Sequence, residues 1–83
     1  MEDNKKLFVA NLAPEVTEGE LEEQFSFFGR VRFVRIIEDK HIAFVKMFNS
    51  GDAYEAKVGL NGIELHGQRI WVEEAYPRKK KTV

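Results

Sequence analysis

The sequence contains no cysteine and no long run of apolar residues. Without cysteine there can be no disulfide framework, no thiolate nucleophile and no cysteine-based metal site. No stretch approaches the length that spans a membrane, and Met1 to Lys6 lack the apolar run of a signal peptide. We therefore expect a domain that does not depend on disulfides and does not enter a membrane.

The chain also lacks an excess of positive charge, since its 83 residues have a formal net charge of −1. That average conceals an uneven distribution, because Arg78 and the three lysines 79–81 supply four of the 13 basic residues. The composition, with 43% hydrophobic and 33% charged residues, is typical of one small globular domain. Whether the domain can approach phosphate groups depends on where its charges lie.

Two short segments, residues 7–12 and 40–47, alternate apolar residues with residues of mixed type. A period of two predicts strands with one face in a core and the other face exposed. Phe8 and Phe44 fall on the exposed faces, where no core position requires them. Aromatic rings beside lysines on an exposed sheet are typical of a surface that stacks single-stranded bases.

Two helices are predicted in the rest of the chain. Thr17 followed by Glu20 forms a capping box, and the first helix ends before Gly29. Its apolar residues recur at helical spacing and are expected in the core: Leu21, Phe25 and Phe28. The second helix is expected to begin with Ser50 as its cap, and Gly59 lowers its propensity by about 1 kcal/mol relative to alanine.

Two further strands, residues 31–37 and 69–75, complete the pattern. In the former, Val34 and Ile36 are expected to face the core, with Arg35 on the other face. The order is strand, helix, strand, strand, helix, strand. It predicts an α+β, ferredoxin-like split βαβ fold (βαββαβ), in which a four-stranded antiparallel sheet carries both helices on one face.

From about Lys5 to Tyr76 the chain resembles the RNA recognition motif family. Residues 7–12 look like the RNP hexamer of that family, and residues 40–47 look like its RNP octamer. Residues 60–62 and 67–72 resemble the end of the second helix and the start of the fourth strand. The resemblance implies a domain that binds single-stranded RNA, with residues 1–5 as an extension, 6–76 as the motif and 77–83 as a basic flexible tail.

By this resemblance, Phe8 and Phe44 would stack on successive bases and Lys40 would pair with a phosphate. Two positions depart from the family pattern. Ile42 stands where an aromatic residue is usual, and His41 stands where glycine is usual. Isoleucine has no aromatic ring and cannot stack on a base, an interaction worth about 1–3 kcal/mol per base. Trp71 could compensate for the missing ring or could cover the edge of the sheet, and the sequence leaves both interpretations open.

The candidate RNA-binding residues therefore combine the two motifs with cations and aromatic side chains expected on or beside the open sheet face. They are Phe8, Phe44, Lys40, Ile42, Lys6, Asn11, Arg35, Lys46, Arg69, Trp71, Tyr76 and His41. The acidic residues, in contrast, gather at the first helix: Glu15, Glu18, Glu20, Glu22 and Glu23. The tail at Arg78 and beyond could extend the RNA path, form part of a nuclear localisation signal or lead to another domain.

An alternative is a protein-interaction module on the same scaffold, with partners at the helices or at Phe27 and Phe33, which fall off the regular core faces. The Arg-x-Phe signature of one such branch of the family is absent. An enzyme is not expected, because the serines and histidines form no catalytic spacing. We expect no cofactor, no metal and no membrane partner. By family resemblance we expect a monomeric domain of a larger protein, acting on pre-mRNA or mRNA in the nucleus, with or without shuttling to the cytoplasm.

Overall fold

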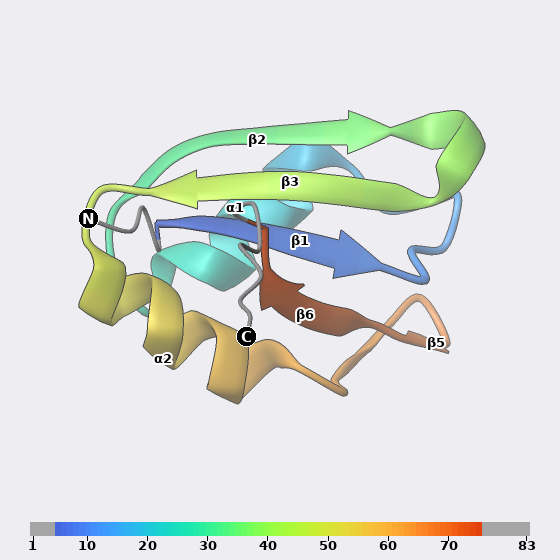
Figure 1. The fold of residues 1–83 in the computed structure, drawn as a ribbon. Helices are drawn as coiled ribbons and strands as arrows, with labels where there is room; N and C mark the ends of the chain where they lie inside the picture. Colours follow the sequence, from blue (N-terminus) through green and yellow to red (C-terminus); the bar gives the residue numbers. More distant parts are fainter. Residues whose placement is uncertain (1–4, 76–83) are drawn as a thin grey trace, which may run out of the picture.

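The computed structural model describes residues 5–75, and its main feature is one four-stranded antiparallel sheet with strand order β2-β3-β1-β6. Its strands are β1 (Lys6–Ala10), β2 (Val31–Ile37), β3 (Ile42–Met47) and β6 (Trp71–Glu74). The two helices, α1 (Glu18–Ser26) and α2 (Ser50–Leu60), pack on the same side of this sheet (Figure 1). The predicted ferredoxin-like fold is confirmed.

Helix α1 begins as the sequence predicts. Thr17 has extended backbone angles, and its hydroxyl accepts a hydrogen bond from the Glu20 N–H at 3.1 Å. The Glu20 carboxylate accepts the Thr17 N–H in return at 3.0 Å, which completes the capping box. The helix then buries Leu21 and Phe25 completely against the sheet.

Helix α2 begins one residue earlier than predicted, because its cap is Asn49 and not Ser50. The Asn49 side-chain oxygen accepts the N–H groups of Gly51 at 2.7 Å and Asp52 at 3.1 Å. Its backbone carbonyl already accepts the first helical bond, from Ala53. Asparagine and serine cap helices about equally well, so the backbone path out of β3 decides which of the two neighbours takes the position.

The glycine inside α2 has a packing reason that propensity alone does not reveal. A Cβ atom at Gly59 would lie 2.5 Å from Cζ of Phe28, so the Phe28 ring rests directly on the helix backbone. Phe28 is half-buried at the rim of the core, whereas we expected it inside. The helix propensity lost at Gly59 is thus offset by a close contact between the end of α1 and α2.

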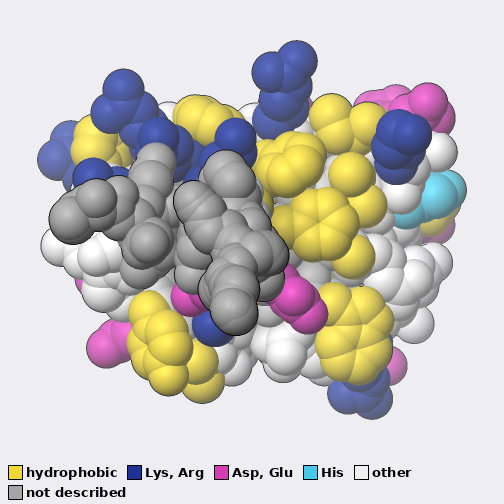
Figure 2. Space-filling model, in the orientation of Figure 1, with side chains coloured by type: hydrophobic (Ala, Val, Ile, Leu, Met, Phe, Trp, Pro, Cys, Tyr) yellow, Lys and Arg dark blue, Asp and Glu magenta, His cyan; other side chains and the backbone are white. Residues whose placement is uncertain are grey.

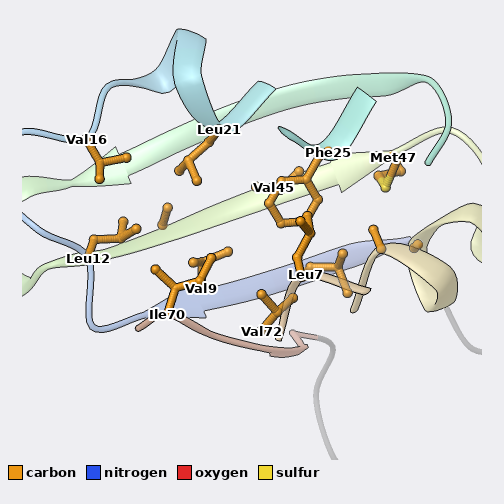
Figure 3. Packing of buried hydrophobic residues seen from close by; sticks show 14 of the residues in the cluster. Leu7, Val9, Leu12, Val16, Leu21, Phe25, Val45, Met47, Ile70 and Val72 are labelled. Atoms are coloured by element: carbon orange, nitrogen blue, oxygen red, sulfur yellow. The ribbon is translucent and has the colours of Figure 1, made fainter. Parts of the chain in front are cut away.

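The core lies between the sheet and the helices (Figure 3). Alternate residues of β1 and β3, including Leu7, Val9 and Val45, are completely buried there, as are Ile70 and Val72 near β6. Val34 and Ile36 of β2 pair with Val45 and Ala43 and pack against the same core, as predicted. No helix or strand within residues 5–75 covers the opposite face of the sheet (Figure 1).

The ends of three strands differ from the prediction. β1 stops at Ala10, because Asn11 turns to a positive φ of 63°. The expected strand at 40–47 begins only at Ile42, because residues Glu38–Lys40 form a 3-10 turn (η1) that His41 closes with a φ of 58°. The β2–β3 connection is nevertheless the short hairpin that the sequence predicts.

The last strand is also shorter than the predicted residues 69–75. Arg69 belongs to β5 (Gln68–Arg69), which pairs with β4 (Glu64–Leu65) in a separate small hairpin. His66 and Gly67 at its tip both have positive φ, 52° and 82°, as in a type I′ turn. In residues 5–75 neither helix is long and apolar enough to cross a membrane.

Candidate nucleic-acid interface

Phe8 and Phe44 stand directly opposite each other on β1 and β3, at the centre of the sheet. Their ring centroids are 5.6 Å apart and the ring planes are tilted by 52°. Because their strand neighbours Leu7, Val9 and Val45 are buried, both rings must point to the uncovered side. We call this side, with the outward residues of β1, β2, β3 and β6, the open face.

Cations border this ring pair. Lys6 places its Nζ 5.4 Å from the centroid of the Phe44 ring, and its backbone position opposes Lys46. Arg35 of β2 opposes Phe44 from the other side. A hollow of about 300 Å³ lies there, lined by Lys6, Phe33, Arg35, Ile37 and Phe44. Figure 2 shows hydrophobic side chains over the middle of this face, with lysine and arginine side chains along its upper border.

Phe33 is a residue of the open face that the sequence analysis named only for a protein partner and did not count among the RNA-binding candidates. It pairs with Lys46 and is 41% exposed, beside Lys6 and Phe44 in the hollow. The signal was available in the alternation, since Phe33 is two residues from Arg35 and must share its face. The open face therefore carries a third ring on β2, although the expected ring position at residue 42 holds isoleucine.

Trp71 lies on the open face, as the alternation predicts. It opposes Ala10 of β1 and is 48% exposed, while its neighbours Ile70 and Val72 are buried. Glu73, two residues further along, directly opposes Phe8. The β6 side of the ring pair is thus acidic where the β2 side is basic, and Figure 2 shows Asp and Glu side chains below the hydrophobic side chains in the middle of this face.

Arg69 and Asn11 have structural partners, and neither belongs to a strand of the main sheet. The Arg69 guanidinium donates to the carbonyl of Gly62 at 3.0 Å. The Asn11 amide donates to the carbonyl of Arg69 at 2.8 Å, and Gln68 donates to the carbonyl of Asn11 at 3.2 Å. These bonds fasten the β4–β5 hairpin to the end of β1, a role that sequence reasoning did not assign to Asn11.

The hairpin end of the sheet holds Ile42, His41 and Lys40. Ile42 is half-buried beside Ile37, whereas His41 and Lys40 are exposed in the turn before β3. The backbone carbonyl of His41 accepts the N–H of Leu12 at 3.0 Å, which ties the hairpin to the β1 exit. The structure thus separates Lys40 from the strand residues of the expected octamer. Tyr76 and the basic tail lie outside the described residues.

The acidic residues of α1 support the fold on the side away from the open face. Glu18 accepts the N–H of Ile36 at 3.1 Å and so satisfies a backbone group on the edge strand β2. The Glu20 carboxylate is hydrogen-bonded by the Thr17 N–H and by Nε2 of His66, which lies 3.0 Å away in the β4–β5 hairpin. These two hydrogen bonds lower the pKa of Glu20 below its usual range. Sequence reasoning left His66 without this partner.

Within residues 5–75 no three His, Asp or Glu side chains are grouped so that they could hold a metal ion. What the open face offers is three phenylalanine rings, an exposed tryptophan and cations at their edges. Such a surface can stack flat aromatic ligands and attract phosphate groups.

Comparison with known proteins shows which family this chain belongs to. The family model of the RNA recognition motif matches residues 7–71, so the chain belongs to the RNA recognition motif family. It is 33% identical over 69 residues to the flowering time control protein FPA of Arabidopsis thaliana. It is 38% identical over 68 residues to the cytotoxic granule-associated RNA binding protein tiar-1 of Caenorhabditis elegans. These alignments cover 83% and 82% of this chain but only 8% and 16% of those relatives.

Solved structures show the same fold. The NONO-1 homodimer of C. elegans superposes with a TM-score of 0.84 at 34% identity, covering 89% of this chain and 29% of that one. The third RNA recognition motif of Mip6 superposes with a TM-score of 0.83 at 29% identity, covering 90% of this chain and 98% of that one. The family is one of RNA-binding domains, and the match points to binding rather than catalysis.

Proposed function

We propose that this domain binds short single-stranded RNA by stacking bases on Phe8 and Phe44. The observation that carries the proposal is the ring pair itself, half-buried on the uncovered face at the centre of the sheet, with the Lys6 ammonium 5.4 Å from one ring centroid. No core contact explains two aromatic side chains at these positions. Base stacking on such rings is tolerant of sequence and is worth about 1–3 kcal/mol per base.

The strand of RNA crosses the sheet, and its path follows the charges of the protein. Lys6, Arg35 and Lys46 lie where phosphates between stacked bases would pass. Glu73 opposes Phe8 and would repel phosphate, so the backbone of the RNA runs on the β2 side of the ring pair. Phe33 and Trp71 extend the aromatic surface at its two edges and offer room for further bases.

For the whole protein we propose a role in processing or regulating mRNA in the nucleus. The names of two relatives, a flowering time control protein and a granule-associated RNA binding protein, support a regulatory setting. The chain spans only a small part of these relatives. A single surface of about two to four stacked bases binds weakly, and linkage to further RNA-binding modules would raise the overall avidity.

The test is the removal of the rings. We expect Phe8→Ala and Phe44→Ala each to weaken binding of a short single-stranded RNA by roughly tenfold or more, because each loses one stacked base. Two-dimensional amide spectra recorded during the titration give both the affinity and the contacted residues. Phe27→Ala is the matched control, since Phe27 is a phenylalanine 74% exposed at the end of α1.

Unchanged RNA binding in the Phe8→Ala/Phe44→Ala double variant would refute the stacking mechanism. If the parent protein shows no amide shifts with RNA, the protein-interaction alternative becomes the leading one. Loss of a protein partner in Phe27→Ala, with RNA binding absent, would then place that partner at the helices.

A further inference from the structure

A second aromatic and basic site lies beyond the end of β3. Phe48 directly follows this strand, and its ring is 46% exposed. The guanidinium carbons of Arg30 and Arg32 lie 5.2 and 5.4 Å from the centroid of this ring, both within the range of a cation–π contact. We call these three residues the Arg–Phe cluster.

The local backbone holds the cluster together. The Phe48 N–H donates to the carbonyl of Arg30 at 3.1 Å, which fixes the loop before β2 against the end of β3. The register of β2 and β3 shifts between Val31 and Phe33, so Arg32 is the extra residue of a β-bulge. A bulge redirects a side chain, and here it accompanies an additional guanidinium beside the Phe48 ring.

The fold does not require this concentration of charge. Arg30 and Arg32 are both exposed, and within residues 5–75 neither guanidinium is paired with a carboxylate. Two like charges held at one ring repel each other, and an anion between or beside them would relieve that repulsion. Guanidinium groups match phosphate geometry better than any other side chain, and holding them against a ring reduces the entropy lost on binding.

The cluster is continuous with the open face. Phe48 lies two residues beyond Lys46, and Arg32 directly precedes Phe33, so both adjoin the last outward pair of β2 and β3. It is at the opposite end of the sheet from the β2–β3 hairpin. Figure 2 shows a separate hydrophobic spot among lysine and arginine side chains at the end where β3 leads into α2.

We propose that the Arg–Phe cluster binds the phosphate backbone of an RNA strand that continues past the nucleotides stacked on the open face. This inference rests on the proposed RNA binding and adds an interaction that the ring pair does not supply. Arg30 and Arg32 bind the phosphate, and Phe48 is a positioning residue that orients the two guanidinium groups. The cluster therefore favours longer RNA over RNA that only fills the open face.

The experiment compares uridine oligomers of about four and about ten nucleotides on the parent and on Arg30→Gln/Arg32→Gln. We expect the double variant to bind the short oligomer like the parent and to bind the long one roughly fivefold more weakly at low salt. The slope of log affinity against log salt for the long oligomer should become shallower by about 0.7 for each phosphate that the variant no longer neutralises. Phe48→Leu should weaken long-oligomer binding with the salt slope nearly kept, because both charges remain.

Lys57→Gln is the control for the removal of a cation elsewhere on the surface, since Lys57 lies on α2, where it pairs with Glu74 at 3.3 Å. It should leave the length dependence unchanged. Equal binding of the long oligomer by the parent and by Arg30→Gln/Arg32→Gln would overturn this inference. Binding of the short oligomer by both proteins would still support base stacking on the open face. A parent that binds neither oligomer would overturn the proposed function and this inference together.

Discussion

The two faces of the sheet use the same residue types for different ends. On the helix face, Phe25 is fully buried and the carboxylates of Glu18 and Glu20 each accept backbone N–H groups. On the open face, Phe8 and Phe44 are only half-buried, and the cations Lys6 and Arg35 lie beside Phe44. An aromatic ring thus stabilises the core on one side of the sheet and, in the function we propose, stacks on bases on the other. The difference is whether a helix covers it.

The largest expected effect on the free energy of unfolding comes from replacing one aromatic ring on each face of the sheet by alanine. We expect Phe25→Ala to lower the free energy of unfolding by about 3–5 kcal/mol, because a completely buried ring leaves a cavity. Phe8→Ala should lower it by only about 1 kcal/mol, because the half-buried Phe8 ring loses its aromatic pair with Phe44 but leaves no enclosed cavity. Urea denaturation monitored by circular dichroism measures both.

Since a small domain has little stability to lose, Phe25→Leu provides a milder variant that keeps the measurement possible. It should still destabilise the protein more than Phe8→Ala does. Equal losses at residues 8 and 25 would mean that the open face is as tightly packed as the core.

A substitution at Gly59 tests the contact between α2 and Phe28 on the helix face. Gly59→Ala should lower the free energy of unfolding by about 1–3 kcal/mol despite the better helix propensity of alanine, because the new Cβ meets the Phe28 ring. In Phe28→Leu, the same Gly59→Ala change should cost less, since the shorter side chain gives way. A double-mutant cycle by urea denaturation checks this, and additive effects would contradict the contact.

The smallest expected effect concerns the carboxylate of Glu20. Its pKa in the folded protein is lowered, first by the Thr17 N–H and then by the hydrogen bond from His66. A depressed folded pKa gives stability that is present above the unfolded pKa and is lost as the pH falls through the folded pKa. The capping box should therefore weaken in acid, while neutral pH leaves it intact.

Carbon-detected titration of the Glu20 carboxyl measures this pKa. His66→Ala should raise it only partway toward its ordinary value, because the Thr17 bond remains. No change at Glu20 in His66→Ala would show that the contact between α1 and the β4–β5 hairpin is absent in solution.

Much of the fold follows from local chemistry. Alternation assigned the faces of Phe8, Phe44 and Trp71, and the Thr17–Glu20 box placed the start of α1. Strand ends were harder to predict. Asn11 leaves the extended region where its side chain bonds Arg69, which is distant in sequence, and His41 leaves it to close the short turn at Glu38–Lys40. The separation of Arg69 from the last strand had the same cause. A short hairpin with an I′ turn forms there, and Asn11 fastens it from the far end of β1.

The sequence by itself determined the order of elements, the ring pair and the side of the sheet on which the rings stand, because these depend on periods of two and 3.6 residues. Only the tertiary structure decided that Phe33 shares the hollow with Lys6, that Gly59 makes room for Phe28, and that Arg30, Arg32 and Phe48 meet. Each of these depends on the register of strands or the approach of helices that are distant along the chain. Such contacts are fixed by packing over the whole domain, which no local pattern contains.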